Sequence, residues 1–175
     1  MDKFVKDIIK DIRVELLDEF DRNFQRKAFF DQPWPSNRMP NRKGSQMNRT
    51  GALRRGMRAT IAGTNIVFTN SQPYAELQNS GGTITITPRM NKFFWAMYYK
   101  TSDGATKSKG KLQSALSEES LAWKRLALKK VGQTIKIDQR QFIGWHPQVK
   151  DHINRIVQHH LKDIEMYLKQ KLRMR

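Results

Sequence analysis

Apolar residues recur at every fourth position near the start of the chain, in the row Phe4, Ile8, Ile12, Leu16, Phe20 and Phe24. This spacing is typical of one face of a helix and predicts a helix over residues 3–30. Because a row of this kind drifts around a helix with 3.6 residues per turn, the apolar stripe is expected to be wide. Pro33 and Pro35 are expected to end the helix, since proline lacks a backbone N–H and restricts the residue before it.

A second long helical pattern lies at the other end of the chain, over residues 147–173. Its helically spaced positions are Val149, Ile153, Ile156, Val157, His160, Leu161, Ile164, Leu168 and Leu172. Between these two patterns, β-branched and alternating segments predict strands over 57–62, 65–70, 83–87 and 134–137, the first two joined as a hairpin. We therefore predict an α+β fold with an N-terminal helix, a small antiparallel sheet containing the hairpin, and a C-terminal helix.

Shorter helices are expected in the middle of the chain. Residues 73–78 predict one helical turn, and Pro88 opens a helix over about 89–100. Ser117, followed by Glu118 and Glu119, has the pattern of an N-cap for a helix that ends near 131–132. Residues 31–50 and 101–114 have no periodicity and are expected to be long loops. With a length of 175 residues, we expect a single domain over residues 1–175.

The charge of the chain is strongly positive and unevenly distributed. The chain has 33 Lys plus Arg and 16 Asp plus Glu, a formal net charge of +17. Residues 1–21 hold four basic and seven acidic side chains, whereas residues 22–58 hold ten basic side chains and a single acid, Asp31. The excess fits either a solvated surface or contact with a polyanion or an acidic partner. The candidate contact residues are Arg38, Arg42, Lys43, Arg49, Arg54, Arg55 and Arg58.

The chain offers few patterns typical of catalytic or metal-binding sites. The chain has no Cys, which excludes disulfides and cysteine nucleophiles. It also lacks the common dinucleotide, phosphate-loop, zinc-protease and serine-hydrolase motifs. His152, His159 and His160 share one predicted helix, but their spacing does not favour a shared metal. We therefore predict that the protein is not an enzyme and uses no cofactor or metal. No segment has the length and hydropathy of a membrane span or the pattern of a secretory signal.

Three segments resemble elements of one protein family. The run from Asn48 to Arg55 is similar to a "TGxLRxS" element, and the run from Pro73 to Gly82 to a "YAxxHxxGG" element with Gln78 at the His position. The run from Gln139 to Gly144 is similar to a late "PxRxFLG" element. In this order and spacing the segments resemble the phage virion morphogenesis (tail completion) proteins. The matching residues are Thr50, Gly51, Leu53, Tyr74, Ala75, Gly81, Gly82, Arg140, Phe142 and Gly144.

The resemblance implies a structural virion protein of a tailed bacteriophage. Members of this family act as rings of identical copies, and we expect a hexamer at the neck or tail end that completes the tail and joins it to the head. The implied partners are other copies of the chain, neighbouring neck, connector and tail-tube proteins, and packaged double-stranded DNA contacted without sequence preference. The implied location is the virion, with assembly in the host cytoplasm.

The basic region leaves an alternative open. Residues 22–58 would also suit a free-standing, sequence-independent DNA-binding protein that contacts phosphates. The sequence does not choose between a basic loop that faces DNA and one that grips an acidic protein ring.

Overall fold

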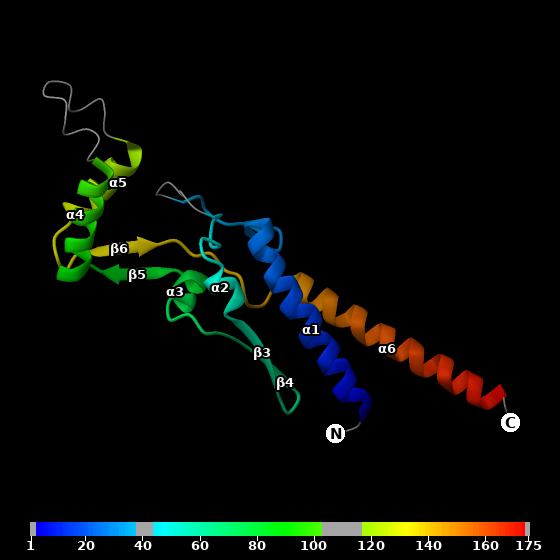
Figure 1. Cartoon of the computed structure of the whole chain (residues 1–175). Coiled ribbons are helices and arrows are strands. Elements are labelled where there is room, and N and C mark those ends of the chain that lie inside the picture. Colours follow the sequence, from blue (N-terminus) through cyan, green and yellow to red (C-terminus); the bar gives the residue numbers. More distant parts are fainter. Residues whose placement is uncertain (1–2, 38–43, 103–116, 174–175) are drawn as a thin grey trace, which may run out of the picture.

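The computed structural model describes residues 3–37, 44–102 and 117–173, and it has the predicted α+β fold (Figure 1). The helices are α1 (Lys3–Arg26), α2 (Ala52–Arg55), α3 (Ala75–Ser80), α4 (Pro88–Ser102), α5 (Glu118–Ala127) and α6 (Pro147–Arg173). The strands are β1 (Ala28–Phe29), β2 (Gln32–Pro33), β3 (Met57–Ala62), β4 (Asn65–Asn70), β5 (Gly82–Thr85) and β6 (Thr134–Ile137). None of the described helices is long and apolar enough to cross a bilayer.

The β-structure consists of three separate antiparallel ladders of two strands each, β1–β2, β3–β4 and β5–β6. The predicted hairpin is confirmed residue by residue, with Ala62 opposite Asn65 across the turn Gly63–Thr64. The third ladder joins segments far apart in the sequence, with Ile84 opposite Ile135. The small antiparallel sheet is therefore distributed over the molecule instead of forming one continuous layer.

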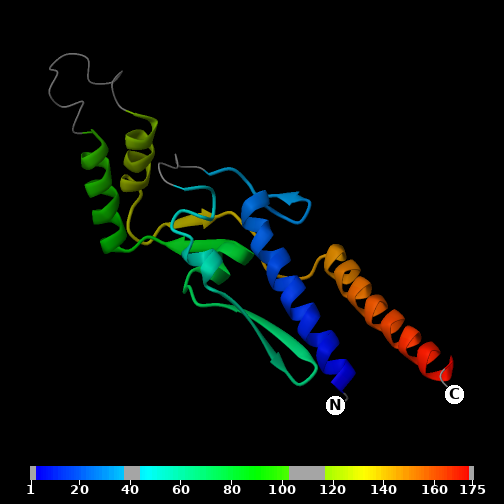
Figure 2. The same ribbon diagram turned by 45° about the vertical axis from the view of Figure 1, so that its right-hand side comes forward.

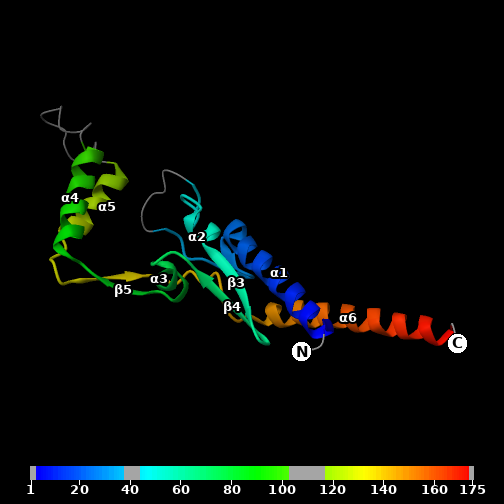
Figure 3. The same ribbon diagram turned by 60° about the horizontal axis from the view of Figure 1, so that its bottom comes forward.

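The molecule is elongated, and its two ends differ (Figure 2). At one end α4 and α5 form a helical hairpin carried on the β5–β6 ladder. At the other end α1 and α6 lie side by side, and α6 continues past the N-terminus of α1 in every view (Figure 3). We call residues 82–102 and 117–137 the arm, and the other described residues the body.

The body is built around buried aromatic side chains from distant segments. Phe24 is 1% exposed and its ring contacts Trp34 and Phe142, at centroid distances of 5.6 and 5.3 Å. The indole Nε1 of Trp34 donates to the backbone oxygen of Gln141 at 2.6 Å. These contacts fix the segment before α6 against the end of α1.

The predicted end of the first helix was wrong, because α1 ends at Arg26 and not at residue 30. Lys27 has a φ of 56°, a left-handed conformation that breaks the helix. The side chain of Asn23 then accepts a hydrogen bond from the backbone N–H of Phe30 at 3.0 Å. The tight β1–β2 hairpin comes next and directs the side chains of Phe29 and Phe30 into the core. A continued helix would also have placed apolar residues there.

Several other boundaries agree with the prediction, but β5 ends at Thr85 and not at residue 87, and α3 starts and ends two residues later than the predicted turn over 73–78. Strands 57–62, 65–70 and 134–137 and the helix over 147–173 have the predicted bounds. Ser117 caps α5 as expected, its hydroxyl accepting from the backbone N–H of Ser120 at 3.2 Å, but α5 ends at Ala127 instead of near 131–132. Of the two predicted loops, residues 38–43 and 103–114 lie outside the described residues, and the second begins later than expected because α4 includes Thr101 and Ser102.

Candidate functional site at the junction of three segments

The three segments that carry the family resemblance meet around one cavity of about 510 Å³. It lies where α2, α3 and the segment after β6 come together. The residues that line it are Asn37, Met47, Arg49, Thr50, Gly51, Ala52, Leu53, Tyr74, Gln78 and Arg140. Residues more than a hundred positions apart in the sequence, such as Asn37 and Arg140, therefore share one surface.

The first segment forms the short helix α2 and anchors it to the core. Gly51 precedes α2 with a φ of 72°, a left-handed conformation that suits glycine, and a Cβ there would lie 2.4 Å from the Arg55 guanidinium. Leu53 is 3% exposed, and its backbone oxygen accepts a hydrogen bond from the Asn70 side chain at 2.7 Å. Thr50 accepts weakly from the Ala52 amide, at 3.4 Å. Gly51 and Leu53 therefore hold α2 in place.

The second and third segments are joined directly by hydrogen bonds. The side-chain oxygen of Asn79 accepts from the backbone N–H groups of Phe142 and Ile143, at 2.9 and 3.0 Å. The backbone N–H of Arg140 donates to the oxygen of Gln78 at 2.8 Å. Gly81, with a φ of 71°, lets the two chains approach, because a Cβ there would lie 3.0 Å from the backbone nitrogen of Gln139.

Asn79 is the residue that sequence reasoning missed. It lies inside the second segment, but its role depends on two amides more than sixty residues away, so no local pattern marks it. The only signal in the sequence is its position at the end of a helical turn, before Ser80 and two glycines.

The remaining motif residues support this junction. Ala75 and Phe142 are buried in the body core, while Tyr74 is 43% exposed at the mouth of the cavity. Gly82 starts β5 opposite Ile137. The Arg140 guanidinium donates to the backbone oxygens of Pro35 and Ser36 at 3.2 and 3.1 Å, which ties the third segment to the loop after β2.

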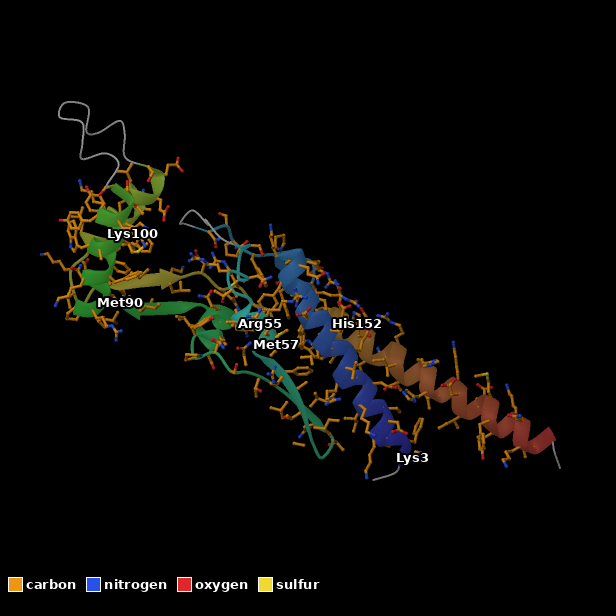
Figure 4. The ribbon with its side chains drawn as sticks, viewed as in Figure 1. Lys3, Arg55, Met57, Met90, Lys100 and His152 are labelled. Atoms are coloured by element: carbon orange, nitrogen blue, oxygen red, sulfur yellow. The ribbon has the colours of Figure 1, made fainter. Side chains whose placement is uncertain are left out.

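The candidate basic residues have different roles in the structure. Arg54 makes a bidentate pair with Asp21 of α1, and this hydrogen bond raises the pKa of Arg54 above its ordinary value despite partial burial. Arg49, Arg55 and Arg58 are exposed, and the last two donate to nearby backbone oxygens. Arg54 thus links α2 to α1, whereas the other three face solvent around α2 and the start of β3, where Arg55 and Met57 are labelled (Figure 4). Arg38, Arg42 and Lys43 lie outside the described residues.

A cluster of possible metal ligands lies between α1 and α6, where Figure 4 labels His152. One ligand atom each from Glu15, Glu19 and His152 lie within 4.8 Å of one another. However, the oxygens of the buried Glu19 accept hydrogen bonds from Arg22 and Arg26, and His152 is 2.8 Å from Glu15. The arginines already neutralise the acidic charge, so the cluster is best described as an ion-pair network that holds α6 on α1.

Electrostatics in this network favour the charged form of Glu19. Burial acts to raise the pKa of Glu19, but the hydrogen bond and charge of Arg26, with the charges of Arg22 and His152, lower it overall. Further along α6, His160 pairs with Asp11 of α1 at 2.7 Å, and its ring also contacts the ring of Phe4. Of the histidines that the sequence placed on one helix, His152 and His160 therefore contact acids of α1, whereas His159 pairs with Asp163 of α6 at 3.6 Å.

The three segments thus form a hydrogen-bonded junction beside a cavity whose lining includes the exposed Arg49 and the half-buried Arg140. Comparison of the chain with protein-family models, with curated proteins and with solved structures found no match.

Proposed function

We propose that this protein is a structural virion subunit of a tailed bacteriophage. In this proposal, six identical copies form a ring at the neck or tail end, complete the tail and join it to the head, without catalysis. The observation that carries the proposal is the meeting of the three motif segments around one cavity. Their residues have structural roles there, as expected for a subunit whose function is assembly.

The shape and surface of the molecule support an assembling subunit. A ring requires two different patches on each copy that meet head to tail. The end of α6 beyond α1 exposes large apolar side chains, of which Leu172 is 73% and Tyr167 58% exposed. Apolar surface of this kind is typical of contacts with other proteins.

The basic surface fits the same role. In a neck ring, cations that face the lumen would attract passing DNA without reading its sequence. The exposed Arg49, Arg55 and Arg58 are available for such contacts or for an acidic neighbouring ring.

The mass of the native assembly tests this proposal most directly. We expect native mass spectrometry of the full chain to show a hexamer, alone or with its neck partners, and electron microscopy to show rings. Deletion of its gene from the encoding phage should yield heads and tails that do not join. Normal infectious particles after deletion would contradict the proposal.

A second candidate function is sequence-independent DNA binding. It is favoured by the exposure of Arg49, Arg55 and Arg58 near one another in the sequence, and weakened by the pairing of Arg54 with Asp21. It predicts duplex affinity that falls by orders of magnitude between low and moderate salt. Replacing the three exposed arginines by Gln should reduce the salt dependence, and a lack of duplex binding at about 50 mM salt would exclude this candidate.

A further inference from the structure

A larger groove adjoins the motif cavity and extends along the arm. Its volume is about 760 Å³, and it is bordered by β6, by the α4–α5 hairpin and by the segment that follows β6. Asn37, Arg49, Gln78 and Arg140 line both the groove and the motif cavity. The two hollows therefore form adjacent parts of one surface.

The groove follows the edge of β6. Five consecutive residues, 134–138, line it, although successive side chains of a strand point to opposite faces. A hollow that touches consecutive residues reaches the edge of the strand, and because Thr83 and Ile84 of β5 also line it, it continues from that edge over one face of the ladder. Among the described residues β6 pairs only with β5, so this edge carries no neighbouring strand.

The hydrogen-bond pattern shows which backbone groups of β6 face the groove. Ile86 donates to the oxygen of Gln133 at 2.8 Å and accepts from the N–H of Gly132 at 2.9 Å. Because bonded and non-bonded pairs alternate in an antiparallel ladder, Ile135 and Ile137 bond to β5. The N–H and C=O groups of Thr134 and Lys136 consequently point away from β5, toward the groove.

The groove offers apolar contacts for alternate side chains of an added strand. Phe94 of α4 is buried, and Met90 and Leu126 pack against the cluster that contains it. Ile84 and Ile137 are only partly buried. All five residues line the groove. A bound strand with apolar residues at every second position would cover this surface.

The charges around the groove favour a negatively charged occupant. Arg49, Lys129, Lys136 and Arg140 line it, and among the described lining residues Asp138 is the only acidic one. A basic segment would be repelled. A polyanion such as nucleic acid would meet the cations but could use neither the strand edge nor the apolar floor, so an acidic polypeptide is favoured.

We propose that this groove binds an extended, acidic segment of a partner protein, which adds to β6 as a third strand. The segment bonds to the backbone of Thr134 and Lys136, places alternate apolar side chains over Phe94 and Leu126, and directs acidic side chains to the surrounding cations. The proposal concerns the chemistry of the groove and does not depend on a virion role.

A synthetic peptide of about eight residues that alternates Val or Ile with Asp or Glu tests the proposal on the full chain. Hydrogen exchange measured residue by residue reports where it binds. In the free protein the amides of Thr134 and Lys136 should exchange fast and those of Ile135 and Ile137 slowly. The acidic peptide should slow exchange at Thr134 and Lys136, and a matched peptide with Lys at every acidic position should not.

Substitutions at one position separate the backbone contribution from the charge. Lys136→Pro removes an outward N–H without breaking the β5 ladder, and we expect it to weaken peptide binding by at least about 10-fold. Lys136→Thr keeps the N–H but removes the charge, and it should weaken peptide binding about 2- to 5-fold. Lys92→Glu, on an exposed part of α4 that does not line the groove, is the control and should change binding by less than about 2-fold. Continued protection of Ile135 and Ile137 verifies that the proline variant is folded.

Several results would overturn the proposal. The proposal fails if up to about 1 mM acidic peptide does not protect Thr134 and Lys136 from exchange. It also fails if the basic peptide binds equally well, or if Lys136→Pro binds the acidic peptide as tightly as the parent. A short DNA duplex that protects the same amides more strongly than the peptide would assign the groove to nucleic acid instead.

Discussion

The body and the arm of this molecule are stabilised in different ways. In the body, the ring of Phe24 contacts Trp34 and Phe142, so its core joins segments more than a hundred residues apart. In the arm, Phe94 contacts Trp123 across the α4–α5 hairpin, and the buried apolar cluster consists of Ile86, Phe94 and Ala127. The body therefore depends on long-range contacts, whereas the arm is a small local unit on a two-stranded ladder, which is marginal by itself.

Because the arm and the body are held together by different contacts, we expect the two regions to respond separately to substitution. Parts of a protein with few buried apolar contacts open at lower free energy than the whole. The arm, which also carries the proposed binding edge, is expected to open before the body. Substitutions in each region should reveal this contrast.

Phe24→Ala should have the largest effect, because it removes a ring that is 1% exposed at the centre of the body. We expect a loss of about 3–5 kcal/mol in the free energy of unfolding. Denaturant unfolding followed by circular dichroism measures it. Val14→Ala, at a position on α1 that is 57% exposed, is the control and should cost less than about 0.5 kcal/mol.

Phe94→Ala should loosen the arm and leave the body folded. We expect the free energy of local opening to fall by about 2–3 kcal/mol, with faster amide exchange in α4, α5 and β6 but not in α1. Phe93→Ala is the matched control on the same helix, because Phe93 is 52% exposed. Equal loss of protection in α1 and α4 would mean that the arm and the body unfold as one unit.

Asn79→Ala should weaken the junction between the second and third motif segments, which lies within the body. The variant leaves the backbone N–H groups of Phe142 and Ile143 without their acceptor, and we expect a loss of about 1–2 kcal/mol. Asn79→Asp retains an acceptor oxygen at the same place, so its free energy of unfolding should fall by less. Calorimetric unfolding of the three proteins provides the comparison, and identical values for both variants would contradict the assigned role.

Glu19→Gln should have the smallest effect and should depend on pH. Because the folded pKa of Glu19 is lowered, its ionised form stabilises the body above its unfolded pKa of about 4.3, and this contribution is lost as the pH falls through the folded value. We expect the variant to be less stable by about 1 kcal/mol at pH 7 and to differ little from the parent near pH 2. Thermal unfolding at both pH values measures the difference, and an equal difference at both would exclude the ion pairs as its cause.

Local patterns predicted those elements whose form depends on neighbours in the sequence. The β3–β4 hairpin has its predicted register because β-branched segments flank Gly63–Thr64, and α6 has its predicted bounds because Pro147 opens an uninterrupted helical pattern. The end of α1 was mispredicted, because Phe29 and Phe30 continue the apolar pattern while Asn23 bonds back to the chain and turns it. The pairing of β5 with β6 was equally inaccessible, since it joins strands separated by two helices.

The α+β class, the long helices at both ends, the hairpin and the net positive charge all follow from local sequence patterns. Periodicity and charge are properties of consecutive residues, so no tertiary contact is needed to recognise them. Tertiary contacts, in contrast, bring three distant segments to one cavity and pair Arg54 with Asp21, and they leave one edge of β6 without a neighbouring strand among the described residues. The reason is that a hydrogen bond such as that of Asn79 to Phe142 depends on where the chain brings the two groups together, and neither residue carries that information alone.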